Sequence, residues 1–143
     1  MAAKMPGVIP MIAYENGIAA LEWLARAFGF REREGSRMTW PDGKTLSHAE
    51  MDAGGGVIML ATPTPDYQSP RRHREHCEPA RRWSAVPYVI DGLLVYVTDV
   101  DAHYERAGRA GATILSGVEE GPDGRRYRAE DLEGHRWMFV QRA

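Results

Sequence analysis

The sequence predicts an α+β fold in which two tandem βαβββ modules form a curved, mixed sheet with the helices outside. The order of apolar runs and helical segments in residues 8–62 returns in residues 93–141. The turn sequence Pro41-Asp42-Gly43 of the first half returns as Pro122-Asp123-Gly124 in the second. Both helical segments also end at a glycine. An internal repeat of this kind indicates one supersecondary unit used twice, so the duplication predicts the fold class better than any single motif.

The length of the chain favours a single domain that contains both modules. At 143 residues it can bury a sizeable core but is too short for two independent domains. Hydrophobic residues make up 43% and charged residues 27% of the sequence, and these ordinary globular proportions exclude wholesale disorder and a fibrous class. We therefore expect one domain over residues 1–143, with module one at 7–62, a connecting arm at 63–90 and module two at 91–143.

Charge and cysteine content limit the partners and the compartment. A net charge of −2 gives no reason to expect a nucleic-acid partner. The first residues lack the apolar segment of a secretion signal, and no apolar run approaches the ~18 residues of a membrane span. The single cysteine, Cys77, cannot form an internal disulfide, which fits a reducing compartment. We expect a cytoplasmic protein without nucleic-acid or membrane partners.

The first module begins with a short apolar run at residues 8–14, where Pro10 favours an edge position. After Gly17, apolar residues recur at helical spacing until Gly29, which ends the helix. Gly35 separates two short extended pieces, and the Pro-Asp-Gly turn leads into the next strand. The strands expected after the helix are residues 30–34, 36–40, 44–52 and 57–61.

The second module repeats this order with a strand at residues 93–98 and a helix for which Asp99 or Asp101 is well placed as the N-cap. Gly111 ends that helix as Gly29 ended the first. Three further strands are expected at residues 112–115, 125–130 and 137–141. The arm at 63–90 is rich in proline and arginine and shows no clean periodicity, so we expect a connecting segment with one or two helical turns around 72–82.

Two phrases of the second module make the sequence similar to a known superfamily. D-V-D-A-H-Y-E-R-A-G-R-A-G-A-T-I starts at Asp99, and D-L-E-G-H-R-W starts at Asp131. Together with the paired modules, they resemble the vicinal oxygen chelate superfamily, which includes glyoxalase I, the extradiol dioxygenases and the bleomycin-resistance proteins. The resemblance covers nearly all of the chain except the arm. It implies that each module curls its sheet around a concave face and that the paired modules form a cup holding a ligand or a metal.

The resemblance also indicates where a metal would be bound. Metal-dependent members carry His, Gln or Glu near the start of the first strand and on the last strand of each module. Those positions fall on Ile9 and Met59 in module one, and on Gly92, or Leu93 one residue on, and Met138 in module two. None of these side chains offers an oxygen or imidazole ligand, and thioethers suit only soft ions such as Cu(I). We therefore expect no metal or other cofactor, and no direct transfer of glyoxalase or dioxygenase activity.

Two other groups of residues keep a metal-dependent alternative open. His48 and Glu50 share one face of a strand because they are two residues apart, where they could bind a metal, contact a ligand, or act as hydrogen-bonded structural residues. His73, His76 and Cys77 could supply three ligands on one helical turn, although the surrounding arginines would repel a cation. The alternative is a lyase, isomerase or dioxygenase whose displaced ligands are His48 and Glu50.

Strand alternation predicts the lining of the cup. Val57, Met59, Leu94, Tyr96 and Met138 share the parity that points away from the helices. Ligand-binding candidates, chosen from this set and from polar or aromatic residues near it, are Trp40, His48, Glu50, Met59, Tyr96, Arg126 and Met138.

These observations favour a metal-independent protein that binds a small organic molecule and sequesters a toxic or antibiotic-like compound. We expect the protein to be a homodimer. A third possibility is an interaction protein that uses the arginine-rich arm.

Overall fold

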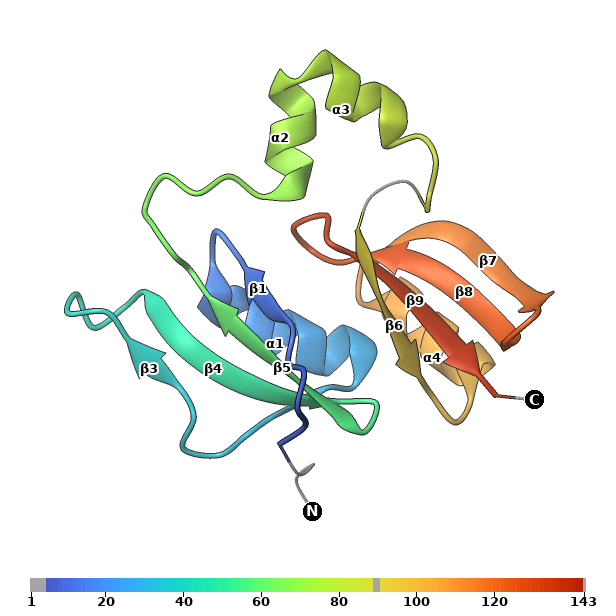
Figure 1. Ribbon diagram of the computed structural model, residues 1–143, viewed down its shortest axis with the longest axis horizontal. Helices are drawn as coiled ribbons and strands as arrows, with labels where there is room; N and C mark the ends of the chain where they lie inside the picture. The colour runs from blue at the N-terminus through green and yellow to red at the C-terminus, as the bar shows by residue number, and fades with distance from the viewer. Residues whose placement is uncertain (1–4, 89–90, 143) are drawn as a thin grey trace. The chain divides into compact units, whose positions relative to one another are not determined.

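The computed structural model describes residues 5–88 and 91–142 and divides the chain into two compact units between Tyr67 and Gln68. Each unit has its own mixed sheet with a helix packed on one face (Figure 1). The predicted α+β class with two modules is therefore confirmed. The strands form two separately hydrogen-bonded sheets, and each unit is described by itself below.

The first unit contains one helix and a sheet with strand order β1-β5-β4-β2, to which β3 adds by pairing with β4. Only β1 and β5 run parallel, while the other pairs are antiparallel. Its elements are β1 (Met11–Ala13), α1 (Gly17–Phe28), β2 (Arg31–Glu32), β3 (Met38–Thr39), β4 (Leu46–Ala53) and β5 (Gly56–Ala61).

Helix α1 begins at Gly17, one residue before the predicted helical run, and ends at Gly29 as the sequence predicts. The Asn16 side chain accepts a hydrogen bond from the Ala19 backbone N–H at 3.0 Å, which satisfies one of the free donors of the first turn. At the other end Gly29 has φ of 74°, the left-handed conformation that a residue without Cβ adopts at least cost. The helix buries Leu24 and Phe28, and it packs on β4 and β5.

Strand β1 is shorter than the expected run 8–14. Pro10 has no N–H to donate, so it cannot continue the ladder on its donor side. Its carbonyl still accepts the backbone N–H of Met59 at 2.9 Å, and regular pairing starts at Met11. Val8 lies outside the strand and is 84% exposed.

The second unit contains three helices and a sheet with strand order β6-β9-β8-β7. Strands β6 and β9 are parallel, which repeats the β1–β5 arrangement of the first unit. Its elements are α2 (Pro70–His76), α3 (Glu78–Trp83), β6 (Gly92–Tyr96), α4 (Val100–Arg109), β7 (Thr113–Gly121), β8 (Gly124–Glu130) and β9 (Arg136–Gln141).

Strand β7 continues well beyond the expected end at Leu115. Its second half is polar, and Glu119 and Glu120 lie opposite Arg126 and Arg125 of β8. Oppositely charged cross-strand pairs stabilise a sheet as apolar pairs do. A prediction that follows apolar runs ends the strand too early for this reason.

Helix α4 is capped by the Asp99 side chain, which accepts the Ala102 N–H at 3.1 Å. Its inner face packs on the sheet around Tyr127, whose hydroxyl lies 2.6 Å from His103 Nδ1. The His103 ring also lies with its centroid 4.1 Å from that of Phe139. Burial raises the pKa of Tyr127, so this core residue is a neutral hydrogen-bonding group.

The arm differs from the expected connecting segment. Helices α2 and α3 span the middle of the arm, around the helical turns expected at 72–82, and both belong to the second unit. Buried Ser69 caps α2 by accepting the Arg72 N–H at 3.2 Å, and Pro70 follows it at the first helical position. No helix in the described part of the chain is long and apolar enough to cross a membrane.

Two glycine substitutions should test the packing of α1. A Cβ on Gly17 would lie 2.6 Å from Leu46 Cδ2, whereas one on Gly108 in α4 would meet nothing within 4 Å. We expect Gly17→Ala to lower the free energy of unfolding by about 1–3 kcal/mol through overpacking. Gly108→Ala should raise it by about 0.5–1 kcal/mol through helix propensity. Urea unfolding of both variants measures the difference, and equal effects would contradict the close approach at Gly17.

Candidate functional site

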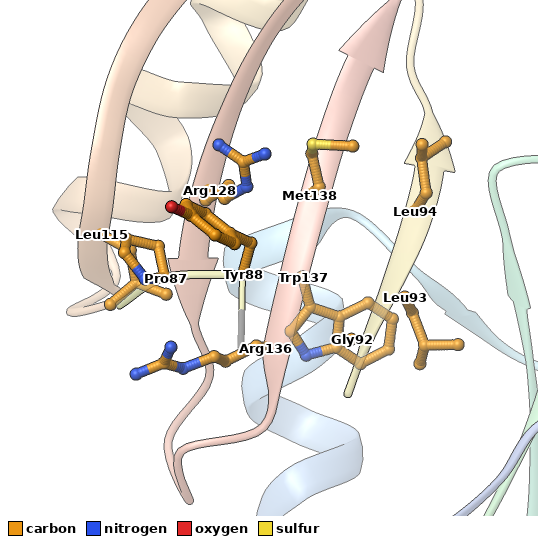
Figure 2. A pocket seen from close by; sticks show the side chains of 10 residues that line it. All are labelled: Pro87, Tyr88, Gly92, Leu93, Leu94, Leu115, Arg128, Arg136, Trp137 and Met138. Carbon is orange, nitrogen blue, oxygen red and sulfur yellow. The ribbon is translucent and has the colours of Figure 1, made fainter. Parts of the chain in front are cut away.

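The second unit has a pocket on the sheet face opposite α4. Leu94, Met138 and Arg128 are cross-strand partners on β6, β9 and β8, so their side chains share one face. The pocket has a volume of about 200 Å³, and Figure 2 shows the side chains that line it. Besides these three residues, its lining includes Leu115, Arg136 and Trp137.

The D-L-E-G-H-R-W phrase fixes one end of this pocket. Buried Asp131 accepts the backbone N–H groups of Glu133 and His135 through Oδ1, at 3.0 and 3.1 Å. Its Oδ2 accepts the indole N–H of Trp137 at 3.1 Å. One carboxylate thus closes the turn and fixes the ring orientation of a pocket residue. Gly134 has φ of 91° and lies so close to Arg71 that a Cβ would be 2.9 Å from its backbone nitrogen.

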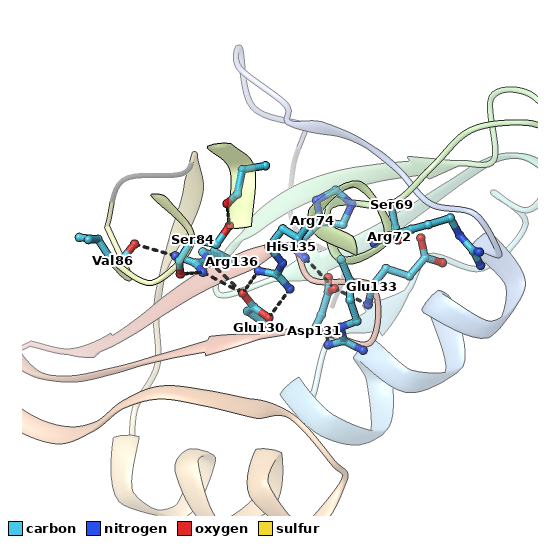
Figure 3. Close-up of polar contacts among 12 residues, drawn as sticks. Ser69, Arg72, Arg74, Ser84, Val86, Glu130, Asp131, Glu133, His135 and Arg136 are labelled. Carbon is cyan, nitrogen blue, oxygen red and sulfur yellow. Dashed lines mark hydrogen bonds and ion pairs between the residues drawn. The ribbon is translucent and has the colours of Figure 1, made fainter. Parts of the chain in front are cut away.

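Arg136 joins the sheet to the end of the arm. Its side chain is only 4% exposed and bonds to Glu130 through Nε at 3.0 Å. Its terminal nitrogens donate to the carbonyl oxygens of Ser84 at 2.6 Å and Val86 at 2.9 Å (Figure 3). The next two residues, Pro87 and Tyr88, line the pocket. Arg136 therefore holds the segment that forms one wall of the site.

Helix α2 is fastened to the same turn by two more arginines. Arg74 contacts both carboxylate oxygens of Glu130, at 2.5 and 3.0 Å. Arg71 donates to the carbonyl oxygens of Leu132 and Asp131 at 2.8 and 2.9 Å. The sequence suggests that the arginines of the arm face solvent or a partner. For Arg71 and Arg74 this is wrong, because their acceptors lie on a turn about sixty residues further along the chain.

Glu130 remains ionised in this environment. Burial alone would raise the pKa of its carboxyl group, but the hydrogen bonds and charges of Arg74 and Arg136 outweigh burial and hold the pKa below its ordinary value. Buried ion pairs stabilise a structure only when every charge is matched by good geometry, and here both carboxylate oxygens are bound.

The first unit also has a pocket, of about 210 Å³, on the face of its sheet opposite α1. We name it the first pocket, and the pocket of the second unit the second pocket. Met11 and Met59 are partners on the parallel strands β1 and β5, and both line this pocket together with His48. His48 Nε2 lies 3.0 Å from Glu50 Oε2, and the other Glu50 oxygen lies 3.6 Å from Arg33 Nε. The predicted candidates His48, Glu50 and Met59 are thus on one face, with Glu50 the cross-strand partner of Met59.

Four predicted candidates do not line either pocket, namely Glu50, which contacts the pocket residue His48, and Trp40, Tyr96 and Arg126. Trp40 donates its indole N–H to the carbonyl oxygen of Thr62 at 2.9 Å. Tyr96 is 38% exposed, and the guanidinium of Arg142 lies 3.9 Å from its ring centroid. Arg126 Nε lies 3.4 Å from a Glu119 oxygen.

Two arginines that line the second pocket are absent from the predicted set. Arg128 could have been found from Arg126 by the two-residue alternation of a strand. Arg136 carries no local signal in the sequence, because its polar partners belong to β8 and to the arm.

The superfamily's metal-ligand positions do not fit a hard or borderline divalent ion. Met59 and Met138 lie in the two pockets and offer thioethers, while Ile9 and Gly92 offer an alkyl group and no side chain. Within residues 5–88 and 91–142, no group of three or more His, Cys, Asp or Glu side chains could hold a metal ion.

Comparison with known proteins identifies the family. Residues 11–139 match the family model described as Glyoxalase/Bleomycin resistance protein/Dioxygenase superfamily. The chain belongs to this superfamily. A curated relative, an uncharacterized protein of Mycobacterium bovis, is 30% identical over 141 residues, which cover 95% of this chain and 83% of the relative.

Solved structures support the same assignment. TioX from Micromonospora sp. ML1 is 32% identical with a TM-score of 0.66, and the match covers 96% of this chain and 97% of TioX. The bleomycin-binding protein of Streptomyces verticillus, solved with copper(II)-bleomycin, has a TM-score of 0.58 at 18% identity over 99% of both chains. TnmS3, an antibiotic binding protein from Streptomyces sp. CB03234, has a TM-score of 0.64 at 17% identity over 100% of both chains. The last two matches show a shared fold.

The ionised Glu130 predicts a defined response to acid. Its folded-state pKa lies below the ordinary value of 4.5, so its contribution to stability is complete above pH 4.5 and is lost as the pH falls through the folded value. Glu130→Gln should cost about 3 kcal/mol at neutral pH, since it leaves buried arginine charge unmatched. The variant should also lose stability less steeply on acidification.

Urea unfolding from pH 7 to pH 3 measures both effects. Glu78→Gln is the matched control, because Glu78 is exposed and its one ion pair within residues 5–88 and 91–142 is with the exposed Arg81 on α3. An unchanged acid slope in Glu130→Gln would contradict the role of this carboxylate.

Proposed function

We propose that the protein binds a small, partly apolar organic molecule without a bound metal and sequesters a toxic or antibiotic-like compound. One observation carries the proposal. Met59 and Met138, at the positions where metal-dependent members of the superfamily hold their ligands, both line pockets. Thioethers replace metal-binding groups there and give each pocket an adaptable apolar floor, because methionine is unbranched and polarizable.

The composition of the pockets supports a binding role. Small-molecule sites are mostly apolar with a few polar groups that fix orientation. The second pocket has this composition, with Leu94, Trp137 and Met138 beside two arginines. The first pocket has it too, with His48 among apolar side chains. Each is smaller than the ~300–1,000 Å³ usual for a drug-sized ligand, so each would hold one or two rings of such a molecule.

Two structural neighbours indicate which type of ligand to test. A bleomycin-binding protein and an antibiotic binding protein share this fold over nearly the whole chain. An antibiotic or a similar toxic compound is the ligand type that this likeness favours.

We also propose that the protein works as a homodimer. Strands β1 and β6 lie at the edges of their sheets, where backbone groups can pair with another chain. The side chains on these edges include large exposed apolar groups, with Met11 at 82% and Leu94 at 43% exposure. A cytoplasmic location stays a prediction.

A second candidate function is a metal-dependent lyase, isomerase or oxygenase with displaced ligands. The 3.0 Å contact between His48 and Glu50 favours it, since the two side chains lie beside a pocket. Against it, the guanidinium of Arg33 lies 3.6 Å from Glu50 and would repel a cation there.

Sequestration should be visible both in cells and with purified protein. We expect cells that produce the protein to tolerate higher concentrations of some antibiotics than cells that lack it. The compounds tested are a panel of aromatic and peptide antibiotics. The compounds against which the protein protects should quench the fluorescence of Trp137, which lines the second pocket. Met138→Lys should weaken binding about tenfold or more by placing a charge in an apolar site.

Val8→Lys is the control variant, because Val8 is 84% exposed outside the strands, and it should bind as the wild type does. Absence of both protection and binding across the panel would count against sequestration.

Elemental analysis separates the two candidate functions. Under the binding proposal, protein purified without chelators contains no stoichiometric Zn, Ni, Mn or Fe, and His48→Ala changes nothing in the metal content. One metal per chain that disappears in His48→Ala would establish the displaced-ligand enzyme instead.

A further inference from the structure

We propose that the pocket of the second unit selects an anionic ligand, a flat apolar molecule that carries an acidic group, and that Arg128 contacts the acid. This inference rests on the proposed binding function and names the chemical class of the ligand. It follows from the charges in the pocket, from the unused donors of Arg128 and from the register of the sheet.

The charged groups in the pocket are all positive. Arg128 and Arg136 line it, and no aspartate or glutamate does so among the described residues. The rest of the lining is apolar apart from Tyr88. In such partly desolvated surroundings a guanidinium attracts an anion more strongly than it would in water, and it recognises carboxylate-like groups through paired N–H donors.

Among the described residues, all three nitrogens of Arg136 already donate hydrogen bonds within the protein, whereas no side-chain hydrogen bond is found for Arg128. Arg136 is held by Glu130 and by two carbonyl oxygens of the arm. Arg128 is 20% exposed, and its nearest charge partner among the described residues, Glu119, lies 3.8 Å away, beyond hydrogen-bond distance. A guanidinium has five N–H donors, and leaving such donors unmatched in a half-buried site costs free energy that a bound anion would offset.

The neighbours of Arg128 neutralise its guanidinium only weakly, so the guanidinium is available to an anionic ligand. The same Glu119 oxygen lies closer to Arg126 Nε, at 3.4 Å, and Glu119 is itself 48% exposed. Gly121 leaves the space in which the Arg126 guanidinium lies, since a Cβ there would be 2.7 Å from Arg126 Nε. One carboxylate therefore faces two guanidinium groups, and Arg128 is the less neutralised of the two.

The register of the sheet sets the shape of the ligand. Arg128, Met138 and Leu94 lie side by side on three neighbouring strands, which are spaced about 4.8 Å apart. An acidic group at Arg128 would place the attached apolar body across Met138 and Leu94, a span of about 10 Å. That length matches two fused or linked aromatic rings.

Two fluorescent probes with the same aromatic frame test this inference directly. 8-Anilino-1-naphthalenesulfonate is N-phenyl-1-naphthylamine with one added sulfonate. We expect the wild type to bind the sulfonate probe about tenfold or more tightly than the neutral one. Arg128→Met should remove this preference, so that the sulfonate probe loses about tenfold or more affinity relative to the neutral probe.

Two further variants are controls for a general loss of positive charge and for misfolding. Arg125→Met removes an arginine from the same strand, but Arg125 pairs with Asp101 and Glu120 outside the pocket, so the preference should persist. Glu119→Gln removes the competing carboxylate and should raise the affinity for the sulfonate probe severalfold without raising the affinity for the neutral probe, whereas a partly unfolded variant would bind both probes more strongly.

The outcomes separate this inference from the proposed function. Equal binding of both probes by the wild type, or a preference that survives Arg128→Met, overturns the anion selectivity and leaves small-molecule binding intact. Failure of the wild type to bind either probe overturns both.

Discussion

The second unit depends on one buried carboxylate, that of Glu130, which is bound by Arg74 from α2 and by Arg136 from β9. Through Arg136 the same network reaches the carbonyl oxygens of Ser84 and Val86. An ion network of this kind loses hydration on burial and is stable only when each charge is matched. Because the match requires helix, strand and arm together, the position of the pocket wall is coupled to the integrity of the sheet.

The sequence predicts those parts of the fold that local interactions determine. Gly29 and Asp99 act within a few residues of themselves, so the sequence predicts Gly29 as the end of one helix and Asp99, with Asp101 as the alternative, as the cap of the other. Apolar alternation likewise locates the central strands. The arm could not be predicted in this way, because the acceptors of Arg71 and Arg74 lie on residues 130–133. The polar half of β7 was missed for the related reason that its partners are charges on the next strand.

The residues of the candidate site could likewise be predicted only where a local pattern determines them. Strand parity identifies Met59 and Met138 as residues on the faces opposite the helices, and the structure places both in pockets. Parity cannot distinguish Arg126 from Arg128, since the two lie on the same face of β8. Glu119 on β7 lies 3.4 Å from Arg126 and 3.8 Å from Arg128, and Gly121 leaves room for the Arg126 guanidinium, while Arg128 lines the pocket. Such a difference requires knowledge of the cross-strand register.

The paired methionines also show how the duplicated halves have diverged. The residue across from Met59 is Glu50, and the residue across from Met138 is Arg128. The two modules therefore present the same thioether beside opposite charges. A duplicated scaffold can thus change the polarity of one binding surface by a single substitution next to an unchanged methionine, so the pocket of each unit can acquire its own charge preference.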